Sequence, residues 1–143
     1  MLTTSSRVAI GAMGLLAAAY NQGSSGITAE KLAEAGPWPR PFLSKVLATL
    51  ARHGLVRGAR GPGGGYVLTR APFDITLFEI VGCFEALNLP DECALGQKEP
   101  CGRLPHCALH NPMQKVRDSL TSFLRNTTLA PFQAQRGPTP RSV

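Results

Sequence analysis

Acidic side chains are missing from a long central part of this 143-residue sequence. No Asp or Glu occurs between Ala35 and Phe73, although six basic residues do. A merely solvated surface would intersperse charges of both signs, so this absence predicts a polyanionic partner such as nucleic acid. The basic excess is local: residues 1–72 hold eight basic and two acidic groups, 8 − 2 = +6, whereas residues 73–143 hold seven of each sign.

The sequence also lacks an apolar run long enough to cross a bilayer. The run at residues 8–20 is short and is interrupted by Gly11 and Gly14, which favours a buried first helix over a signal peptide. We therefore expect a cytoplasmic protein with no membrane partner. In that compartment the four cysteines stay reduced, and clustered thiols bind metal or carry out redox chemistry more often than they form disulfides.

The first half of the chain has the pattern of a winged helix-turn-helix. Helices are predicted at residues 4–20, 28–35 and about 41–53, followed by two β-prone runs at 55–57 and 66–68. The third helix has an apolar stripe at spacing i, i+3, i+4, i+7, made of Leu43, Val46, Leu47 and Leu50. The β-prone runs flank a glycine-rich stretch, which indicates a hairpin. In a winged helix-turn-helix the third helix enters the major groove and the hairpin, or wing, contacts the backbone or minor groove.

The side chains predicted to contact double-stranded DNA lie on the third helix and the wing. Arg40, Ser44 and Lys45 are assigned to the major groove. Arg60, within the glycine-rich stretch, is assigned to the minor groove. Arg52 and Arg57 are assigned to phosphates. A nucleotide-binding loop is a poorer interpretation of the glycines, because no Gly-Lys-Ser/Thr ending follows them.

The second half of the chain is expected to hold a ligand loop and a long helix. A helix at residues 76–86 contains Cys83, which is interpreted as a small apolar side chain and not as a ligand. A loop of about 25 residues follows, too long for a plain connector. A second helix, capped by Asn111, runs to about residue 129 with an amphipathic pattern that favours packing or dimerisation. Three regions are thus expected: DNA-binding residues 1–72, the loop and dimerisation helix at 73–132, and a disordered tail at 133–143.

The loop carries a cluster of metal-ligating residues with the spacing C-x7-C-x5-C-x2-H. Its members are Cys93, Cys101, Cys107 and His110. Three thiolates and one imidazole can hold a zinc ion or an iron–sulfur cluster. The wide intervals favour an iron–sulfur cluster, since structural zinc commonly uses tight C-x2-C pairs. His106 could replace His110 as the fourth ligand.

Two other functional classes remain open at this point. In the first, zinc stabilises a winged-helix regulator or adaptor and the thiols sense nothing. In the second, Cys107 and a neighbouring histidine form a nucleophile pair of an enzyme. The enzyme interpretation is poor because no oxyanion site or third orienting group is recognisable, so we expect a protein that is not an enzyme.

Several of these segments together carry a family resemblance that spans residues 3 to about 132. They are the early Thr3-Thr4-Ser5 with Arg7 and Ala12-Met13, the run 43–56 ending in Gly54-Leu55-Val56, the wing motif at 60–66 (RGPGGGY), the cysteine triplet, and the stretch 120–129 (LTSFLRNTTL). The sequence resembles the Rrf2 family of bacterial transcription regulators, which includes IscR, NsrR and RirA. The wing motif and the cysteine triplet are specific in combination.

The resemblance implies a homodimer, joined through its last helix, that binds a palindromic operator with an affinity tuned by the cluster. Cluster supply, oxidants or nitric oxide would be the signal. NsrR-like members take a carboxylate ligand from the partner's first helix, but no acidic residue precedes Glu30 here. His110 stands where IscR-like members have a histidine ligand, which favours a 2Fe–2S cluster. The Cys93–Cys101 interval is wider than the family's usual one, so a 4Fe–4S cluster is the alternative.

Overall fold

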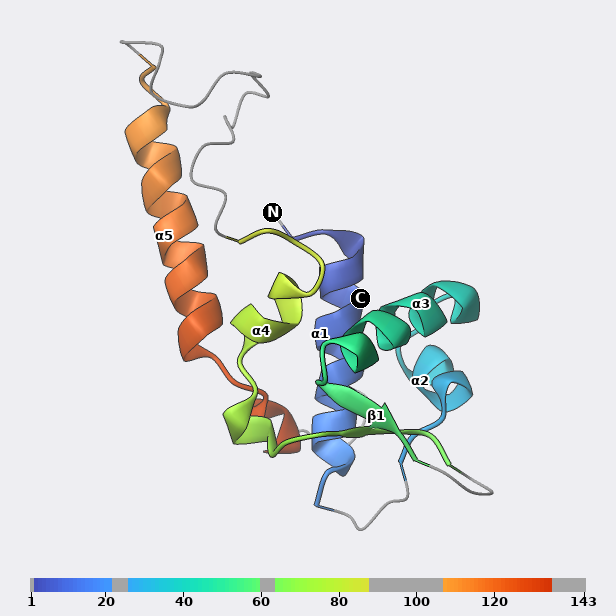
Figure 1. The fold of residues 1–143 in the computed structure, drawn as a ribbon. Helices are drawn as coiled ribbons and strands as arrows, with labels where there is room; N and C mark the ends of the chain where they lie inside the picture. Colours follow the sequence, from blue (N-terminus) through green and yellow to red (C-terminus); the bar gives the residue numbers. More distant parts are fainter. Residues whose placement is uncertain (1, 22–25, 60–63, 88–106, 135–143) are drawn as a thin grey trace, which may run out of the picture.

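The computed structural model describes residues 2–21, 26–59, 64–87 and 107–134. These residues form a mainly helical fold with one small antiparallel hairpin, as the sequence predicts (Figure 1). The elements are α1 (Thr4–Ala19), α2 (Ala29–Ala35), α3 (Arg40–Arg52), β1 (Val56–Gly58), β2 (Tyr66–Leu68), η1 (Pro72–Asp74), α4 (Leu77–Gly82), α5 (His110–Asn126) and η2 (Ala130–Ala134). No helix in the described ranges is long and apolar enough to cross a membrane.

Local sequence signals define the ends of the first helices. Thr3 and Thr28 accept hydrogen bonds from backbone N–H groups in the first turns of α1 and α2, and so satisfy donors that have no partner within the helix. Helix α3 ends at Arg52 with His53 as its C-cap, and Gly54 follows with a φ of +73°, a conformation that a glycine adopts without steric cost. The three predicted helices of the first half are therefore confirmed within a residue or two.

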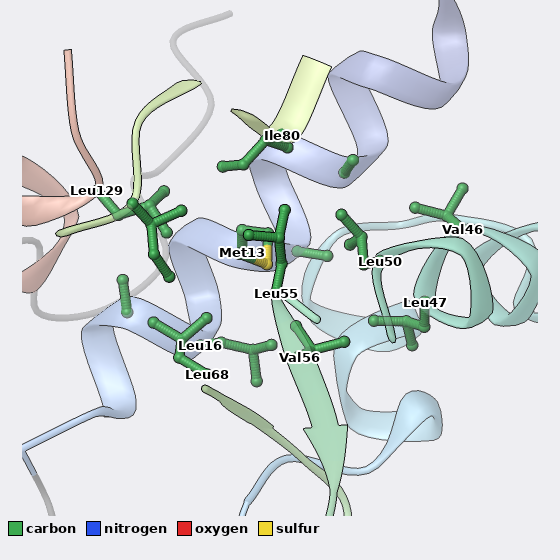
Figure 2. Packing of buried hydrophobic residues seen from close by; sticks show 14 of the residues in the cluster. Met13, Leu16, Val46, Leu47, Leu50, Leu55, Val56, Leu68, Ile80 and Leu129 are labelled. Carbon is green, nitrogen blue, oxygen red and sulfur yellow. The ribbon is translucent and has the colours of Figure 1, made fainter. Parts of the chain in front are cut away.

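Helix α1 passes through the centre of the core. The predicted stripe of α3 packs against it, and all four of its residues are buried. Figure 2 shows Met13 and Leu16 of α1 among side chains from α3, the hairpin, α4 and the segment after α5. One continuous core therefore includes residues from both halves of the sequence.

The hairpin is joined by a third piece of backbone at the end next to its glycine-rich loop. Val56 pairs with Leu68 and Gly58 with Tyr66 in an antiparallel register. Ile27, just before α2, exchanges two backbone hydrogen bonds with Tyr66, at 3.0 and 2.8 Å. A Cβ atom on Gly65 would lie 2.3 Å from the Ile27 carbonyl carbon, so this close approach requires a glycine.

The second half of the chain departs from the sequence prediction at helix ends. Helix α4 ends at Gly82 and not near residue 86, because the chain turns at Cys83 and sends the Glu85 carboxylate to the start of α1. Helix α5 begins at His110, after Leu109 and without a side-chain cap, where Asn111 was expected as the cap. It ends at Asn126, three residues before the expected end.

The segment after α5 returns to the core. Leu129 is fully buried, and its N–H lies within hydrogen-bonding distance of the carbonyl oxygens of Pro72 (3.1 Å) and Ile75 (3.0 Å). Phe132 packs against α1 so closely that a Cβ on Gly14 would lie 2.6 Å from its ring. Gln133 and Ala134, expected in a disordered tail, belong to η2, and the rest of that tail lies outside the described residues.

Candidate nucleic-acid interface and ligand loop

The outer face of α3 is basic, small and exposed. Arg40, Ser44, Lys45 and Arg52 all lie on this surface, opposite the buried stripe. Ala48 and Ala51 are exposed between them, so no bulky side chain separates the backbone of α3 from an approaching surface. The structure thus brings together on one helix face the four α3 residues predicted from the sequence to contact DNA.

Thr49 organises the last turn of this helix. Its hydroxyl donates to the Lys45 carbonyl at 3.1 Å and accepts from the Arg52 guanidinium at 3.1 Å. The ring nitrogen Nδ1 of His53 lies 2.9 Å from the Thr49 carbonyl oxygen. Because these contacts orient the Arg52 and His53 side chains, the C-terminal end of α3 presents a pre-positioned basic group. Sequence reasoning did not single out Thr49, although its position three residues before Arg52 was a usable signal.

An acidic residue stands beside the first predicted DNA contact. The Glu30 carboxylate on α2 lies 3.7 Å from the Arg40 guanidinium, and both side chains are about two-thirds exposed. An ion pair this exposed adds little to stability, but it sets the electrostatic environment of Arg40. The contact between Glu30 and Arg40 was not predicted from the sequence.

The basic residues of the wing differ in their surroundings. Arg57 is exposed on β1, whereas Arg60 lies outside the described residues. Arg70, at the end of β2, forms an ion pair with Glu79 at 2.7 Å and donates to the Asp74 carbonyl at 3.0 Å. Of the described wing arginines, Arg57 therefore lies exposed on β1, and Arg70 is engaged within the protein.

Two of the four predicted metal ligands are described, and they lie on one turn of backbone. The His110 N–H donates to the Cys107 carbonyl at 3.2 Å as the chain enters α5, and both residues are half-buried. Cys93 and Cys101, like the alternative ligand His106, lie outside the described residues. Within the described ranges, no three Cys, His, Asp or Glu side chains come together as a metal site.

Cys83 is not part of the predicted ligand loop; it is the residue that directly follows α4. Its thiol donates to the Glu79 carbonyl at 3.2 Å and it packs against the core. Burial, and then the nearby Glu79 carboxylate, raise the pKa of the Cys83 thiol. A thiol of this kind is a poor nucleophile at neutral pH. These surroundings agree with the interpretation of Cys83 as a packing residue.

Helix α5 carries apolar side chains that the described part of the chain leaves uncovered. Only Leu124 on this helix is buried, whereas Val116 is 43% and Phe123 is 56% exposed. An open groove of about 440 Å³ runs along the same face, lined by Lys115, Val116, Ser119, Leu120 and Phe123. At its C-terminal end α5 is fixed to α4, where the Arg125 guanidinium stacks over the Phe78 ring at 3.8 Å.

Comparison with known proteins gives a consistent result over nearly the whole chain. The model of the Rrf2 family, described as an iron-dependent transcriptional regulator, matches residues 2–135. The regulator IscR of Cronobacter sakazakii is 30% identical over 128 residues, which cover 90% of this chain and 76% of that protein. Such relatives are transcriptional regulators, a non-enzymatic role.

Solved structures show the same fold. IscR of T. potens superposes with a TM-score of 0.71 at 26% identity, covering 96% of this chain and 93% of its own. CymR of B. subtilis, a global cysteine regulator, superposes with a TM-score of 0.75 at 23% identity, covering 96% and 98%. The latter identity is low enough that only the shared fold follows from it.

Proposed function

The chain belongs to the Rrf2 family of transcriptional regulators, and from this premise we propose that it is a homodimeric DNA-binding sensor. Its operator would be palindromic, and its affinity for that operator would follow the state of a metal centre. The ligands would be Cys93, Cys101, Cys107 and His110. An iron–sulfur cluster is favoured, of the 2Fe–2S type before 4Fe–4S, and zinc is the alternative.

The observation that carries the DNA-binding proposal is the outer face of α3. It presents exposed basic and small residues, and no acidic residue lies within the helix itself. A helix of this composition can approach the floor of the major groove without repelling phosphates. Arg40, Ser44 and Lys45 would read bases, Arg52 and Arg57 would bind phosphates, and Arg60 would enter the minor groove.

The uncovered face of α5 supports the homodimer. A row of apolar side chains along one helix is costly in water, and a second copy of the same row can cover it by two-fold symmetry. The two α3 helices of such a dimer would meet two half-sites of the operator at a fixed spacing. A change in that spacing alters affinity without any change in the contacts each helix makes.

The donor set fits an iron–sulfur cluster. Thiolates are the standard ligands of such clusters, and a histidine replaces a cysteine in some of them. Cys107 and His110 are joined by a backbone hydrogen bond at the first turn of α5. A cluster would supply a redox-active and oxidant-sensitive centre. The His110 side chain would then connect that centre to the helix proposed to join the two subunits.

The test begins with the full chain purified under anaerobic conditions. Its visible absorption spectrum is recorded, and iron, sulfide and zinc are assayed on the same sample. We expect brown or red protein with iron and sulfide in equal amounts, about two or four of each per chain. C107S removes one proposed ligand and should lose the cluster. C83S removes a thiol outside the set and is the matched control, which should keep it.

The alternative outcomes are distinct. Stoichiometric zinc without sulfide would establish the zinc-stabilised regulator and remove cluster sensing.

DNA binding is then measured by selecting duplexes from a randomised library and titrating the selected duplex at fixed salt. A selected sequence without two-fold symmetry would contradict the palindromic operator. Absence of any enrichment would contradict sequence-specific binding.

A further inference from the structure

The two residues that follow β2, Thr69 and Arg70, lie at one of the places where the first half of the chain meets α4. These two residues bond in different directions. The Thr69 hydroxyl donates to the carbonyl oxygens of Gly54 and Leu55, at 2.5 and 3.2 Å, in the turn that leaves α3. The Arg70 guanidinium instead donates to the Asp74 carbonyl and to the Glu79 carboxylate on α4. The base of the wing is therefore held between the turn that follows α3 and helix α4.

Glu79 uses its two carboxylate oxygens for two different tasks. Oε2 accepts from the N–H and hydroxyl of Thr76, at 3.0 and 3.1 Å, and completes the capping box that starts α4. Oε1 accepts from Arg70 at 2.7 Å. Burial alone raises the pKa of Glu79, but the hydrogen bonds from Thr76 and Arg70 outweigh it and hold that pKa below its usual value. The carboxylate thus fixes the start of α4 and the end of the wing to each other.

In the sequence, the cysteine loop follows the other end of α4. Glu85 accepts hydrogen bonds from the backbone N–H of Thr3 at 2.7 Å, from the Thr3 hydroxyl at 2.9 Å and from the buried Ser6 hydroxyl. The chain between Glu79 and Glu85 is a single short helix and one turn. In sequence, Cys93 follows only eight positions after Glu85. The segment 76–85 therefore lies between the wing and the first proposed ligand in the sequence.

We propose that Arg70 and Glu79 are positioning residues for DNA binding, whose ion pair transmits the ligation state of the cysteine loop through α4 to the wing. This inference rests on the proposed cluster-dependent DNA binding. Neither side chain would touch the DNA or the cluster. Their role is to make the position of β2 depend on the position of α4, so that binding of the cluster and binding of DNA are coupled.

The experiment measures that coupling directly. The dissociation constant for the selected duplex is determined for metal-free protein and for protein reconstituted anaerobically with Fe²⁺ and sulfide. The ratio of the two constants is compared among variants. E79Q removes the charge while keeping a capping box, which glutamine also forms. R70Q removes the other partner, and R70K keeps the charge. E34Q makes the same charge change as E79Q at an exposed position on α2 and is the matched control.

For the wild-type protein a ratio of about 5- to 150-fold is expected from typical allosteric coupling. E79Q and R70Q should bring the ratio at least threefold closer to one, with unchanged iron content and a metal-free affinity within twofold of wild type. R70K should recover part of the ratio, and E34Q should leave it unchanged. In metal-free E79Q, amide hydrogen exchange should be at least threefold faster in peptides covering residues 66–70.

Each other result has a defined meaning. If E79Q and R70Q both keep the ratio of dissociation constants measured for the wild-type protein, the positioning role is overturned and the proposed function stays intact. An equal loss in E34Q would show a general charge effect and would also overturn it. A wild-type ratio of one, in protein that carries the cluster and binds the duplex, would overturn cluster-dependent binding itself and the coupling role with it.

Discussion

The Glu30 carboxylate on α2 lies 3.7 Å from the Arg40 guanidinium at the start of α3. Arg40 thus has an acid of its own chain beside it on the face proposed to read DNA. A phosphate or a base edge would have to compete with that carboxylate for the guanidinium. If Arg40 reads DNA as proposed, Glu30 would weaken the DNA contacts that do not satisfy Arg40 fully, and would so penalise incorrect DNA sequences more than correct ones.

E30Q should accordingly tighten binding to unrelated duplex DNA by about threefold at low salt, and should tighten binding to the selected duplex less. The specificity ratio would fall. Fluorescence-anisotropy titrations with both duplexes at two salt concentrations check this, and the effect should shrink as salt increases. E34Q, on the same helix, controls for the loss of one negative charge. An equal gain in E34Q would contradict a particular role of the Arg40 contact.

The wing offers a matched pair of glycine substitutions. A Cβ on Gly65 would lie 2.3 to 2.5 Å from backbone atoms of Ile27 and Thr28, whereas nothing lies within 4 Å of a Cβ on Gly58. Backbone atoms cannot move aside as a flexible side chain can. We expect G65A to break the bridge between Ile27 and Tyr66 and to destabilise the protein by about 1–3 kcal/mol. G58A, in the same hairpin, should change stability by less than about 0.5 kcal/mol.

Urea unfolding of both glycine variants measures the stability difference, and duplex titration measures its effect on binding. G65A should also weaken DNA binding, since the wing would lose its connection to the start of α2. Equal stability of G65A and wild type would show that the wing can be held without this backbone approach. Loss of binding in G58A without loss of stability would instead assign a direct DNA contact to that part of β1.

Much of the DNA-binding half could be predicted from the sequence because its signals are local. The apolar stripe of α3 recurs with the helical period, Gly54 ends the helix, and the glycine-rich run separates two β-prone segments. Each of these patterns needs only a few neighbouring residues to be recognised. The exposed basic face followed from the same periodicity, because residues opposite a buried stripe face solvent.

The C-terminal ends of α4 and α5 were mispredicted because they depend on contacts between distant segments. Glu85 bonds to Ser6 across 79 residues, and no local pattern marks a carboxylate for that use. The pairing also explains why α4 is shorter than its apolar pattern suggests. Leu129 continues the helical spacing of α5, yet its N–H bonds to Pro72 and Ile75, so the helix ends earlier. Tertiary hydrogen bonds overrode helix propensity at both places.

The contact between Glu85 and the start of α1 predicts a specific dependence of stability on pH. Burial raises the pKa of Glu85, but hydrogen bonds from Ser6 and Thr3 outweigh it and hold that pKa below its usual value of 4.5. A carboxyl whose pKa is lower in the folded state stabilises the protein above its unfolded pKa. That contribution is lost as the pH falls through the folded pKa.

E85Q should therefore be less stable than wild type at pH 7 by about 1 kcal/mol, as expected for the loss of hydrogen bonds to a charged group. The difference should disappear at a pH below the folded pKa, where the wild-type carboxyl is itself protonated. Urea unfolding followed by circular dichroism at pH 7 and in acid checks both points, with E34Q as a control at an exposed site. A difference that persists unchanged in acid would contradict a contribution from the charge.

The exposed apolar face of α5 makes the homodimer testable with one substitution and one control. Phe123 is 56% exposed and lines the groove, and it makes little contact with its own core, so F123E should leave the monomer folded. A buried carboxylate at a two-fold interface faces its own copy, and the repulsion and desolvation should raise the dimer dissociation constant by about 100-fold or more. S122E places the same charge at the neighbouring exposed position, which does not line the groove, and should dimerise normally. Sedimentation velocity over a concentration series measures both variants.

Because two half-sites require two joined subunits, F123E should also lose cooperative binding to the selected duplex while each subunit keeps its weak affinity for DNA. A dimer of unchanged stability in F123E would place the subunit contact elsewhere.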